Sequence, residues 1–366
     1  MSAYIIAACR SAVVPRGGAF AALSLDMLGA PVLRAVLAQA GIDPAQVDEV
    51  IVSNAIGGGG NPARLVALAA GLPETVAGLS IDRQCAGGLD ALLLASALVE
   101  NGAAQVVIAG GVESYSRRPL RLRTFVDGRA PEPYDQPPFT PWPDRDPDMA
   151  VAADALAQSL GITRSEQDTW ATHSHAKALA AQPQDQEIVE VEGQTRDPFT
   201  RRLTPALAAR AKVVNGTITA ANMAVAADGA AFCVVVSEKI RRQLSCDGIA
   251  ILGGATMGHA PDMPALAPVA AIRFALEKTR LSAHDITRAE IMEAFAVQAI
   301  ACVQGAGLDP ERVNTGGGAL ARGHPVGASG TVNAVRLFHE LRKTGGTGLA
   351  AIAAAGGIAT ALVLGA

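Results

Sequence analysis

One cysteine, Cys85, follows a short polar run and precedes two glycines and a long apolar segment, in IDRQCAGGLDALLLASALVENG. The apolar segment has the spacing of a helix, so the thiol is expected at a strand-to-helix junction. The N–H groups and the dipole at a helix N-terminus favour an anion and lower the pKa of a thiol, and the thiolate is the nucleophilic form. A buried, inert cysteine is the alternative, and it is the interpretation kept for the other four cysteines. The pattern predicts that Cys85 is a nucleophile.

A histidine, His324, lies in the glycine-dense stretch NTGGGALARGHPVGASG, just before a segment with helical spacing. An imidazole near the start of a helix stays neutral more readily, which suits a general base. The alternative is a phosphate-binding glycine loop with an incidental histidine, but the sequence has neither a Walker lysine pattern nor G-x-G-x-x-G after a strand. The remaining histidines are interpreted as surface or helix-face residues: His173, His175, His259, His284 and His339.

Alternating short β-rich and helical segments must position these two residues. The alternation covers residues 1–115 and resumes from about residue 220, which predicts a mostly parallel sheet with helices on both faces. Between them, residues 116–148 are rich in Pro, Arg and Asp, and a helix with a Thr-x-x-Glu capping box is expected over 163–182. A strand–turn–helix–strand pattern recurs at both ends of the chain. It suggests a duplicated α/β half, with each half supplying one loop to a shared site.

Composition narrows the class of protein. The chain has 366 residues, of which 50% are hydrophobic and 17% charged, which predicts two or three domains with a sizeable core. The net charge of −4 gives no basic field for nucleic acid or membrane, and no apolar run reaches the roughly 18 residues of a membrane span. The five cysteines are widely spaced without C-x-x-C, which argues against a disulfide framework or a metal site and fits a reducing cytosol. The N-terminus reads as a first strand and not as a signal peptide.

Five sequence blocks resemble the ordered signature blocks of thiolases, the acyl-CoA acyltransferases: RQCAGGLDAL, IAGGVES, GTITAANMAVAADGAA, EIMEAFAVQA and NTGGGALARGHPVGASG. The similarity covers essentially the whole chain. It implies an α/β thiolase fold, with two duplicated βαβαβαββ halves in a five-layered α-β-α-β-α core and an inserted loop domain. By this resemblance, residues 1–115 and 241–250 form the N-terminal half, 116–240 the coenzyme A-binding insertion, and 251–366 the C-terminal half.

The resemblance also implies roles for the two candidate residues. Cys85 would accept the acyl group as a thioester, His324 would be the base that activates it, and a second nucleophile would then take the acyl group. The backbone N–H groups of Cys85 and Ala355 would form oxyanion holes. Acyl-CoA would be a substrate, with no permanently bound cofactor and no metal. The chain is expected to form a homodimer or homotetramer in the cytoplasm, without nucleic acid or membrane partners.

Two catalytic positions depart from the family pattern. Met292 replaces the asparagine of Asn-Glu-Ala-Phe, which holds a water in an oxyanion hole, and a thioether donates no hydrogen bond. Loss of one such donor typically raises the barrier by about 2.7–4 kcal/mol. Ala353 replaces the second catalytic cysteine, which exchanges the α-proton of the second acyl-CoA. Ala355 replaces a glycine, but its backbone N–H remains.

Coenzyme A contacts are partly preserved. Met149 and Phe295 match the family pattern, whereas Ala224 replaces a serine and Asp148 replaces a histidine. The lobe at 116–148 is expected to shape the acyl pocket. Its RRPLRLR stretch either meets the phosphates of coenzyme A or forms a solvated basic loop.

These departures lead to one hypothesis and two alternatives. The hypothesis is an acyltransferase that forms acyl-Cys85 but passes the acyl group to a heteroatom, to water or to a nucleophile made by decarboxylation. The first alternative is an ordinary acetyl-CoA acetyltransferase or 3-ketoacyl-CoA thiolase with substitute groups. The second is a catalytically weak binding or scaffold subunit.

Overall fold

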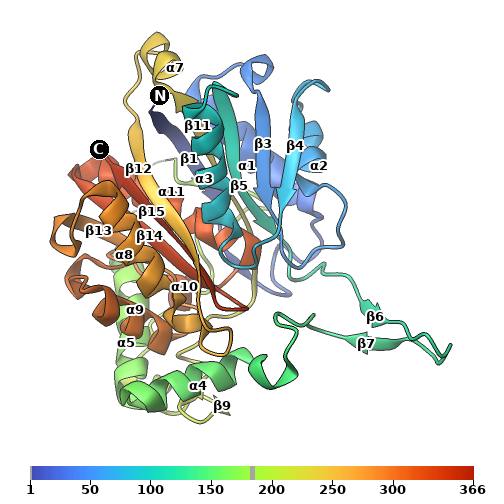
Figure 1. Ribbon diagram of the computed structural model, residues 1–366, viewed down its shortest axis with the longest axis vertical. Helices are drawn as coiled ribbons and strands as arrows, with labels where there is room; N and C mark the ends of the chain where they lie inside the picture. Colours follow the sequence, from blue (N-terminus) through green and yellow to red (C-terminus); the bar gives the residue numbers. More distant parts are fainter. Residues whose placement is uncertain (1, 182–185) are drawn as a thin grey trace.

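The computed structural model describes residues 2–181 and 186–366, and two α/β halves stand side by side in it (Figure 1). The N-terminal half follows the order strand–helix three times and ends in two strands. Its elements are β1 (Ala3–Ser11), α1 (Leu25–Ala40), β3 (Glu49–Ser53), α2 (Pro62–Ala69), β4 (Ala77–Ile81), α3 (Gly87–Glu100), β5 (Val106–Glu113) and β11 (Ala227–Ser237).

The C-terminal half repeats this order, except that its third strand is reduced to a single bridge between Ala289 and Val313. Its elements are β12 (Ile249–Gly258), α8 (Ala267–Thr279), β13 (Ile286–Ile291), α9 (Ala296–Ala306), α11 (Val326–Thr344), β14 (Thr347–Ala354) and β15 (Ile358–Gly365). The repeat predicted from the sequence pattern is therefore present in the order of the elements.

The strands form one continuous sheet in the order β13-β14-β15-β12-β1-β11-β5-β3-β4. The two halves join where β1 pairs with β12 over only two residues, Tyr4 and Ile5. The prediction of a mostly parallel sheet is wrong. The pairs β3–β4, β3–β5 and β13–β14 are parallel, but β11 is antiparallel to β1 and β5, and β15 is antiparallel to β12 and β14. Each half ends in a strand that returns beside earlier strands, and this return reverses its direction.

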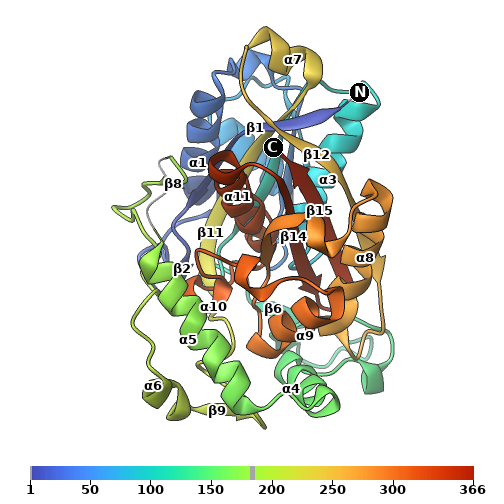
Figure 2. The ribbon, with the colours of Figure 1, turned by 90° about the vertical axis from the view of Figure 1, so that its left-hand side faces the viewer.

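The helices and sheets stack in five layers (Figure 2). Helices α1 and α2 cover the outer face of the N-terminal strands, and α8 with α9 covers the C-terminal ones. Helices α3 and α11 lie between and contact strands of both halves. A helix that packs between strands of both halves needs apolar or small residues on most of its surface, and the sequence of α3, GGLDALLLASALVE, meets that need, although Leu94 and Ala97 remain exposed. The expected α-β-α-β-α core is confirmed.

An insertion between β5 and β11 packs against the lower end of this core (Figure 1). Its main helices are α4 (Met149–Leu160) and α5 (Arg164–Ala180), which contact α9. The capping box is present, because Thr163 Oγ1 accepts from the Glu166 N–H while Glu166 accepts from the Thr163 N–H. The predicted helix end at residue 182 lies outside the described residues. Smaller elements are α6 (Pro205–Ala209), β9 (Val213–Asn215) and β10 (Ile218–Thr219).

Buried ion pairs fix the returning part of the insertion to the core. Arg10 of β1 pairs with Glu187 at 2.7 Å and with Asp197 at 2.8 Å. Asp197 also pairs with Arg322, just before His324 in the chain, and Glu187 pairs with Arg336 of α11. Removing one partner would leave a buried charge uncompensated, so these pairs hold the insertion, β1 and α11 in one arrangement.

The insertion ends earlier than residue 240 in this arrangement. β11 falls within the range 116–240 given to the insertion by the resemblance, but it lies in the sheet between β1 and β5. We therefore propose that the insertion ends near residue 226 and that α7 (Glu238–Gln243) links the two halves. In the part of the chain that the structure describes, no helix is both long and apolar enough to cross a membrane.

Candidate active site

The two central helices cross in backbone contact at their glycines. A Cβ atom on Gly88 of α3 would lie 2.6 Å from the Thr331 backbone nitrogen, and one on Gly330 of α11 would lie 2.6 Å from the Leu89 nitrogen. Real Cβ atoms do not approach so closely, so only glycine permits this crossing. The Thr331 hydroxyl donates to the Gly88 carbonyl across it. The crossing brings the N-termini of both helices to one edge of the core.

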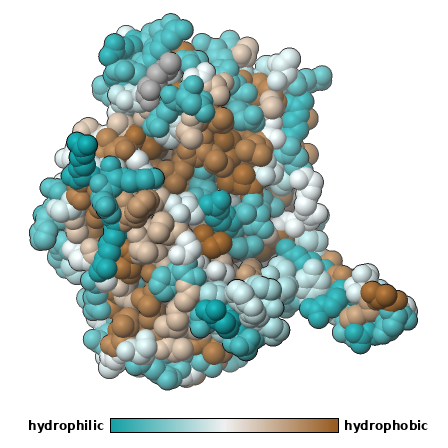
Figure 3. Space-filling model, viewed as in Figure 1, coloured by the Kyte–Doolittle hydropathy of each residue, from teal (hydrophilic) through white to brown (hydrophobic). Residues whose placement is uncertain are grey.

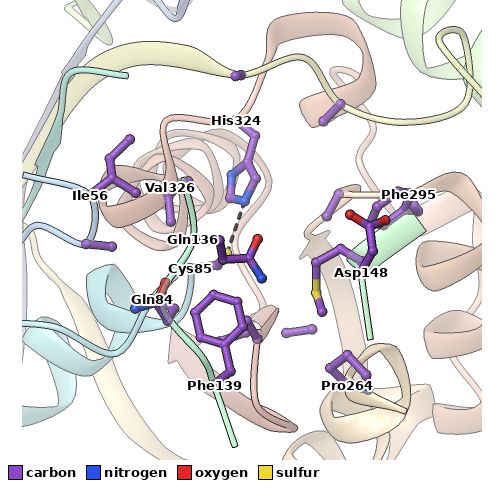
Figure 4. Close-up of a pocket in the computed structure, with 18 of the residues that line it drawn as sticks. Ile56, Gln84, Cys85, Gln136, Phe139, Asp148, Pro264, Phe295, His324 and Val326 are labelled. Carbon is purple, nitrogen blue, oxygen red and sulfur yellow. Dashed lines mark hydrogen bonds between the residues drawn. The ribbon is translucent and has the colours of Figure 1, made fainter. Parts of the chain in front are cut away.

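Cys85 and His324 meet at that edge. The distance from Cys85 Sγ to His324 Nε2 is 3.1 Å (Figure 4). His324 Nδ1 lies 2.6 Å from the Ser329 hydroxyl, which is 3.1 Å from the Pro325 carbonyl oxygen. If this hydroxyl donates to Pro325, it accepts from Nδ1–H, and the lone pair of Nε2 then faces the thiol. The predicted nucleophile and base are therefore within hydrogen-bond reach.

The backbone on both sides of the pair is held in place. Gln84, directly before Cys85, has a φ of 50°, and its N–H donates to the Asp82 carboxylate at 2.8 Å. A left-handed residue before the nucleophile turns the chain sharply from β4 into α3. The His324 N–H donates to the Val225 carbonyl at 2.8 Å, which ties the histidine loop to the segment before β11.

Burial keeps both groups neutral at rest. It raises the pKa of the Cys85 thiol to about 12, with a further upward contribution from the Glu113 and Asp82 charges. It lowers the pKa of His324 to about 4. The prediction of a lowered thiol pKa at the helix start is therefore wrong, because loss of hydration outweighs the helix terminus. Such a pair reacts by transferring the thiol proton to His324 as the sulfur attacks.

The pair opens into a cavity of about 640 Å³. It is bounded by α3, α11, the turn after β14 and the insertion. Figure 4 shows Ile56, Gln84 and Val326 on one side of the pair and Asp148 and Phe295 on the other. Seven of the predicted site residues line the cavity: Cys85, His324, Met149, Ala224, Phe295, Ala353 and Ala355. Among the described residues, no cluster of His, Cys, Asp and Glu suits a metal ion.

Comparison with known proteins assigns the family. The model of the thiolase N-terminal domain matches residues 3–239, and that of the thiolase C-terminal domain matches residues 247–366. The chain belongs to the thiolase family. Thiolases transfer acyl groups, so it is a member of an enzyme family of acyltransferases.

The proteins similar to this thiolase align with it over almost its whole length. It is 39% identical over 375 residues to a Bacillus subtilis protein named an acetyl-CoA C-acetyltransferase, with 99% of each chain covered. It is 35% identical over 397 residues to a Staphylococcus aureus protein named an acetyl-CoA acyltransferase, with 98% of each covered. Among solved structures, the Bacillus anthracis acetyl-CoA acetyltransferase matches with a TM-score of 0.91 at 33% identity, covering 100% of this chain and 98% of that one. The Acat5 thiolase from Ascaris suum in complex with coenzyme A matches with a TM-score of 0.92 at 29% identity over all of both chains.

The structure places the two positions that are predicted to depart from the thiolase pattern in different surroundings. Ala353 lines the cavity near the end of β14, so a methyl group, which can neither accept nor donate a proton, faces the site at this position. Met292 does not line the cavity. It is 1% exposed and packs in the apolar cluster between the two sheets. The thioether therefore extends the apolar core and offers no hydrogen-bond donor.

Two buried glutamates shape the thiolase site without touching the nucleophile. Glu113 accepts from Asn54 Nδ2 at 2.7 Å, from the Ala55 N–H at 3.0 Å and from the Gly327 N–H at 2.9 Å. It thus ties the loop after β3 to the first turn of α11. Burial raises the pKa of Glu113 to about 7.

The second glutamate, Glu293, directly follows Met292 in the chain. It accepts from Trp170 Nε1 at 3.0 Å, Ser174 Oγ at 2.7 Å, Asn314 Nδ2 at 2.8 Å and the Leu320 N–H at 3.1 Å. These contacts join α5 of the insertion to α10 (Ala319–Arg322), the turn that leads to His324.

Sequence reasoning missed several residues of this site. Ser329 lies five positions after His324, and a helix starting at Val326 would have placed it one turn further on, near the imidazole. Gln298 is 2% exposed, lines the cavity, and has an amide nitrogen without a hydrogen-bond partner in the described part of the chain. The other histidines lie outside the cavity, on the surface or on helices, although His175 and His339 are buried.

Proposed function

We propose that this thiolase transfers acyl groups from acyl-CoA through a thioester on Cys85. The contact of 3.1 Å between Cys85 Sγ and His324 Nε2 inside the cavity carries this proposal. His324 accepts the thiol proton as the sulfur attacks the thioester carbonyl carbon, and it then donates that proton to the departing coenzyme A sulfur. The Cys85 and Ala355 N–H groups stabilise the charge on the carbonyl oxygen. The first half-reaction balances as acyl-CoA plus thiol giving acyl-cysteine plus coenzyme A.

The second half-reaction then depends on the same single base. His324 is neutral again after coenzyme A leaves, so it can deprotonate a thiol, an amine or a water that takes the place of the leaving group. A carbon acid needs a base opposite His324, and Ala353 provides none. A carboxylate that lines the cavity, Asp148, accepts from the Ala150 N–H at the start of α4, across the cavity from the pair (Figure 4). We propose a heteroatom acceptor, or a carbanion formed by decarboxylation, in place of carbon–carbon bond formation through a proton abstraction.

Mass spectrometry of the intact protein tests the first half-reaction. After incubation with a panel of acyl-CoA thioesters, the wild type should gain the mass of one acyl group on Cys85, and C85S should gain none at that position. Failure of every chain length to form an adduct would refute the proposal. If Cys85 also resists iodoacetamide and the protein co-purifies with another chain, the scaffold alternative holds instead.

An ordinary acetyl-CoA acetyltransferase is the second candidate, and the names of the relatives favour it. Gln136 and Gln298 line the cavity and could donate hydrogen bonds in place of the lost asparagine. The two candidates differ in one assay. Cleavage of acetoacetyl-CoA by coenzyme A at an ordinary thiolase rate supports the second candidate, whereas acyl-Cys85 formation without this cleavage supports the first.

We also propose that the enzyme works as a homodimer or homotetramer in the cytoplasm, with coenzyme A thioesters as substrates and not as resident cofactors. The coenzyme A complex of the Ascaris suum thiolase supports the choice of substrate. The five cysteines are free thiols, which suits a reducing compartment.

A further inference from the structure

Two arginines stack on one tyrosine at the mouth of the cavity. The guanidinium carbons of Arg16 and Arg118 lie 5.6 Å and 5.1 Å from the centroid of the Tyr115 ring. A third arginine, Arg121, lines the same part of the cavity. One carboxylate in this group is Asp135, which pairs with Arg118 at 3.1 Å and is 88% exposed. A second carboxylate, the buried Asp228, accepts from the N–H and the hydroxyl of Ser116, the residue after Tyr115. Three arginines against two aspartates leave one positive charge in excess.

Arg16 has no carboxylate partner among the described residues, and its backbone is fixed. Its N–H donates to the Ala226 carbonyl at 2.9 Å, and Ala226 forms a bridge with His324. The Tyr115 ring provides a flat, electron-rich surface for its guanidinium. A guanidinium held in this way by a ring keeps its planar fork free for an anion.

The chain neighbours of Arg118 indicate that it lies toward the side of the cavity lined by Ile56, opposite Phe295, one of the residues expected to contact coenzyme A. Arg118 precedes Pro119, which approaches Gly58 in the loop after β3, beside Ile56. Figure 4 places Ile56 on one side of the Cys85–His324 pair and Phe295 on the other. A thioester centred on Cys85, with its pantetheine toward Phe295, would direct the far end of its acyl chain toward the arginines.

We propose that the acyl groups handled by this enzyme end in a carboxylate, and that Arg16 and Arg118 bind this carboxylate. The inference rests on the proposed acyl transfer from acyl-CoA. Arginine binds planar carboxylates with two parallel hydrogen bonds. A chain that ends in a methyl group cannot accept these hydrogen bonds. The arginines would then select acyl-CoA thioesters of dicarboxylic acids over those of monocarboxylic acids. Arginine also binds phosphate, so the experiment must distinguish the acyl carboxylate from the phosphates of coenzyme A as the bound anion.

The test compares acylation of Cys85 by adipyl-CoA and hexanoyl-CoA, which have the same number of acyl carbons and the same coenzyme A. Succinyl-CoA and butyryl-CoA form a shorter pair. Rates are measured at low thioester concentration by intact mass. The wild type should react roughly tenfold faster or more with the dicarboxylic member of at least one pair, as expected for a charge-assisted hydrogen bond. The R16M and R118M variants should lose this preference, because the rate with the dicarboxylic member falls toward that with the monocarboxylic member.

Arg117 provides a matched control, because it is exposed, adjacent to Arg118 in the chain, and does not line the cavity. R117M removes the same charge and should keep the preference. Equal rates for both members of both pairs in the wild type would overturn the inference. A uniform loss for all thioesters in R16M and R118M, with unchanged melting temperatures, would overturn it too and would assign the arginines to coenzyme A phosphates. The absence of any adduct with all four thioesters would instead refute the proposed function.

Discussion

At the scale of single residues, a half-buried thiol and a half-buried imidazole face each other without a carboxylate behind the histidine. Ser329 supplies the contact at Nδ1, and a neutral hydroxyl orients the ring without stabilising an imidazolium. Burial therefore dominates both pKa values, upward for Cys85 and downward for His324. The resting pair is neutral, and its reactivity depends on proton transfer during the attack.

The neutral pair predicts a specific pH profile for alkylation by iodoacetamide. Only the thiolate reacts, and the Cys85 pKa of about 12 lies above the assay range, so the rate should rise about tenfold per pH unit between pH 7 and 10 without a plateau. Acylation by thioesters needs the unprotonated imidazole, so it should be lost as pH falls through about 4, the pKa of His324. Mapping by mass is required because Cys246 is also partly exposed. A plateau beginning near pH 7 would contradict the neutral pair.

Removing the Ser329 hydroxyl should impair positioning of His324. S329A deletes the contact of 2.6 Å to Nδ1, so the imidazole loses its fixed tautomer and orientation. We expect the acylation rate to fall roughly fivefold to tenfold, the effect of one hydrogen bond, with little change in melting temperature. S159A is the control, because the Ser159 hydroxyl also donates to a carbonyl within a helix, at the far end of α4. Equal acylation rates in S329A and S159A would show that the hydroxyl has no such role.

Introducing a cysteine at position 353 and an asparagine at position 292 should allow the enzyme to cleave a carbon–carbon bond. Ala353 faces the cavity and is only partly buried, so A353C has room for a thiol, and M292N adds a donor. We expect the A353C/M292N variant to cleave acetoacetyl-CoA roughly a hundredfold faster than the wild type, the lower range for a positioned base. M292N alone should give no gain. Cleavage by the wild type as fast as by the double variant would mean that another group already serves as the base.

At the scale of elements, the crossing of α3 and α11 places the nucleophile and the base at one edge. Each helix begins next to one catalytic residue, since α3 starts two residues after Cys85 and α11 starts two residues after His324. The distance between the helices is set by glycines, and the buried carboxylate of Glu113 fixes the first turn of α11 from below. The geometry of the pair is therefore a property of helix packing more than of either loop.

A methyl group at the crossing should separate the pair. G330A places a Cβ 2.6 Å from the Leu89 nitrogen, so the helices must move apart, and we expect a loss of about 1–3 kcal/mol of unfolding free energy. Acyl-Cys85 formation should fall by at least tenfold in the protein that remains folded. G258A is the matched control, since a Cβ at Gly258 of β12 meets no atom within 4 Å. Denaturant unfolding and intact mass measure the two effects, and similar values for both variants would contradict the packing argument.

At the scale of the whole molecule, surfaces remain that suit assembly. β4 ends the sheet with an unpaired edge, and Leu79 on it is 44% exposed. Leu94 of α3 is 41% exposed, and Figure 3 shows apolar side chains gathered on the face where α3 lies in Figure 1. The β6–β7 hairpin (Arg121–Arg123 and Glu132–Tyr134) stands away from the body (Figures 1 and 3), although two such short strands have little stability alone. Both features fit the proposed assembly with further copies of the chain.

The open edge leads to a prediction about the oligomeric state. The wild type should sediment as a dimer or tetramer, and L94E should lower the mass toward the monomer, because a charge would be buried in the interface. Leu160, at the end of α4, is 49% exposed, so L160E adds the same charge on the insertion and should leave the assembly intact. Light scattering after gel filtration measures the mass. A monomeric wild type would contradict the expected assembly.

The family, the repeated halves, the capping box at Thr163 and the pairing of Cys85 with His324 could all be predicted from the sequence, because they depend on local spacing and on motifs that occur in order along the chain. The sequence also predicts that Met292 and Ala353 depart from the thiolase pattern. The fold shows which of these two positions faces the cavity: Ala353 lines it, and Met292 is in the core. It decided the mixed direction of the strands, the neutral state of the pair and the arginines at the cavity mouth. Strand direction depends on where a distant segment returns, and a pKa depends on how much water the folded chain removes. Neither the direction of a strand nor a pKa can therefore be predicted from residues that are adjacent in the sequence.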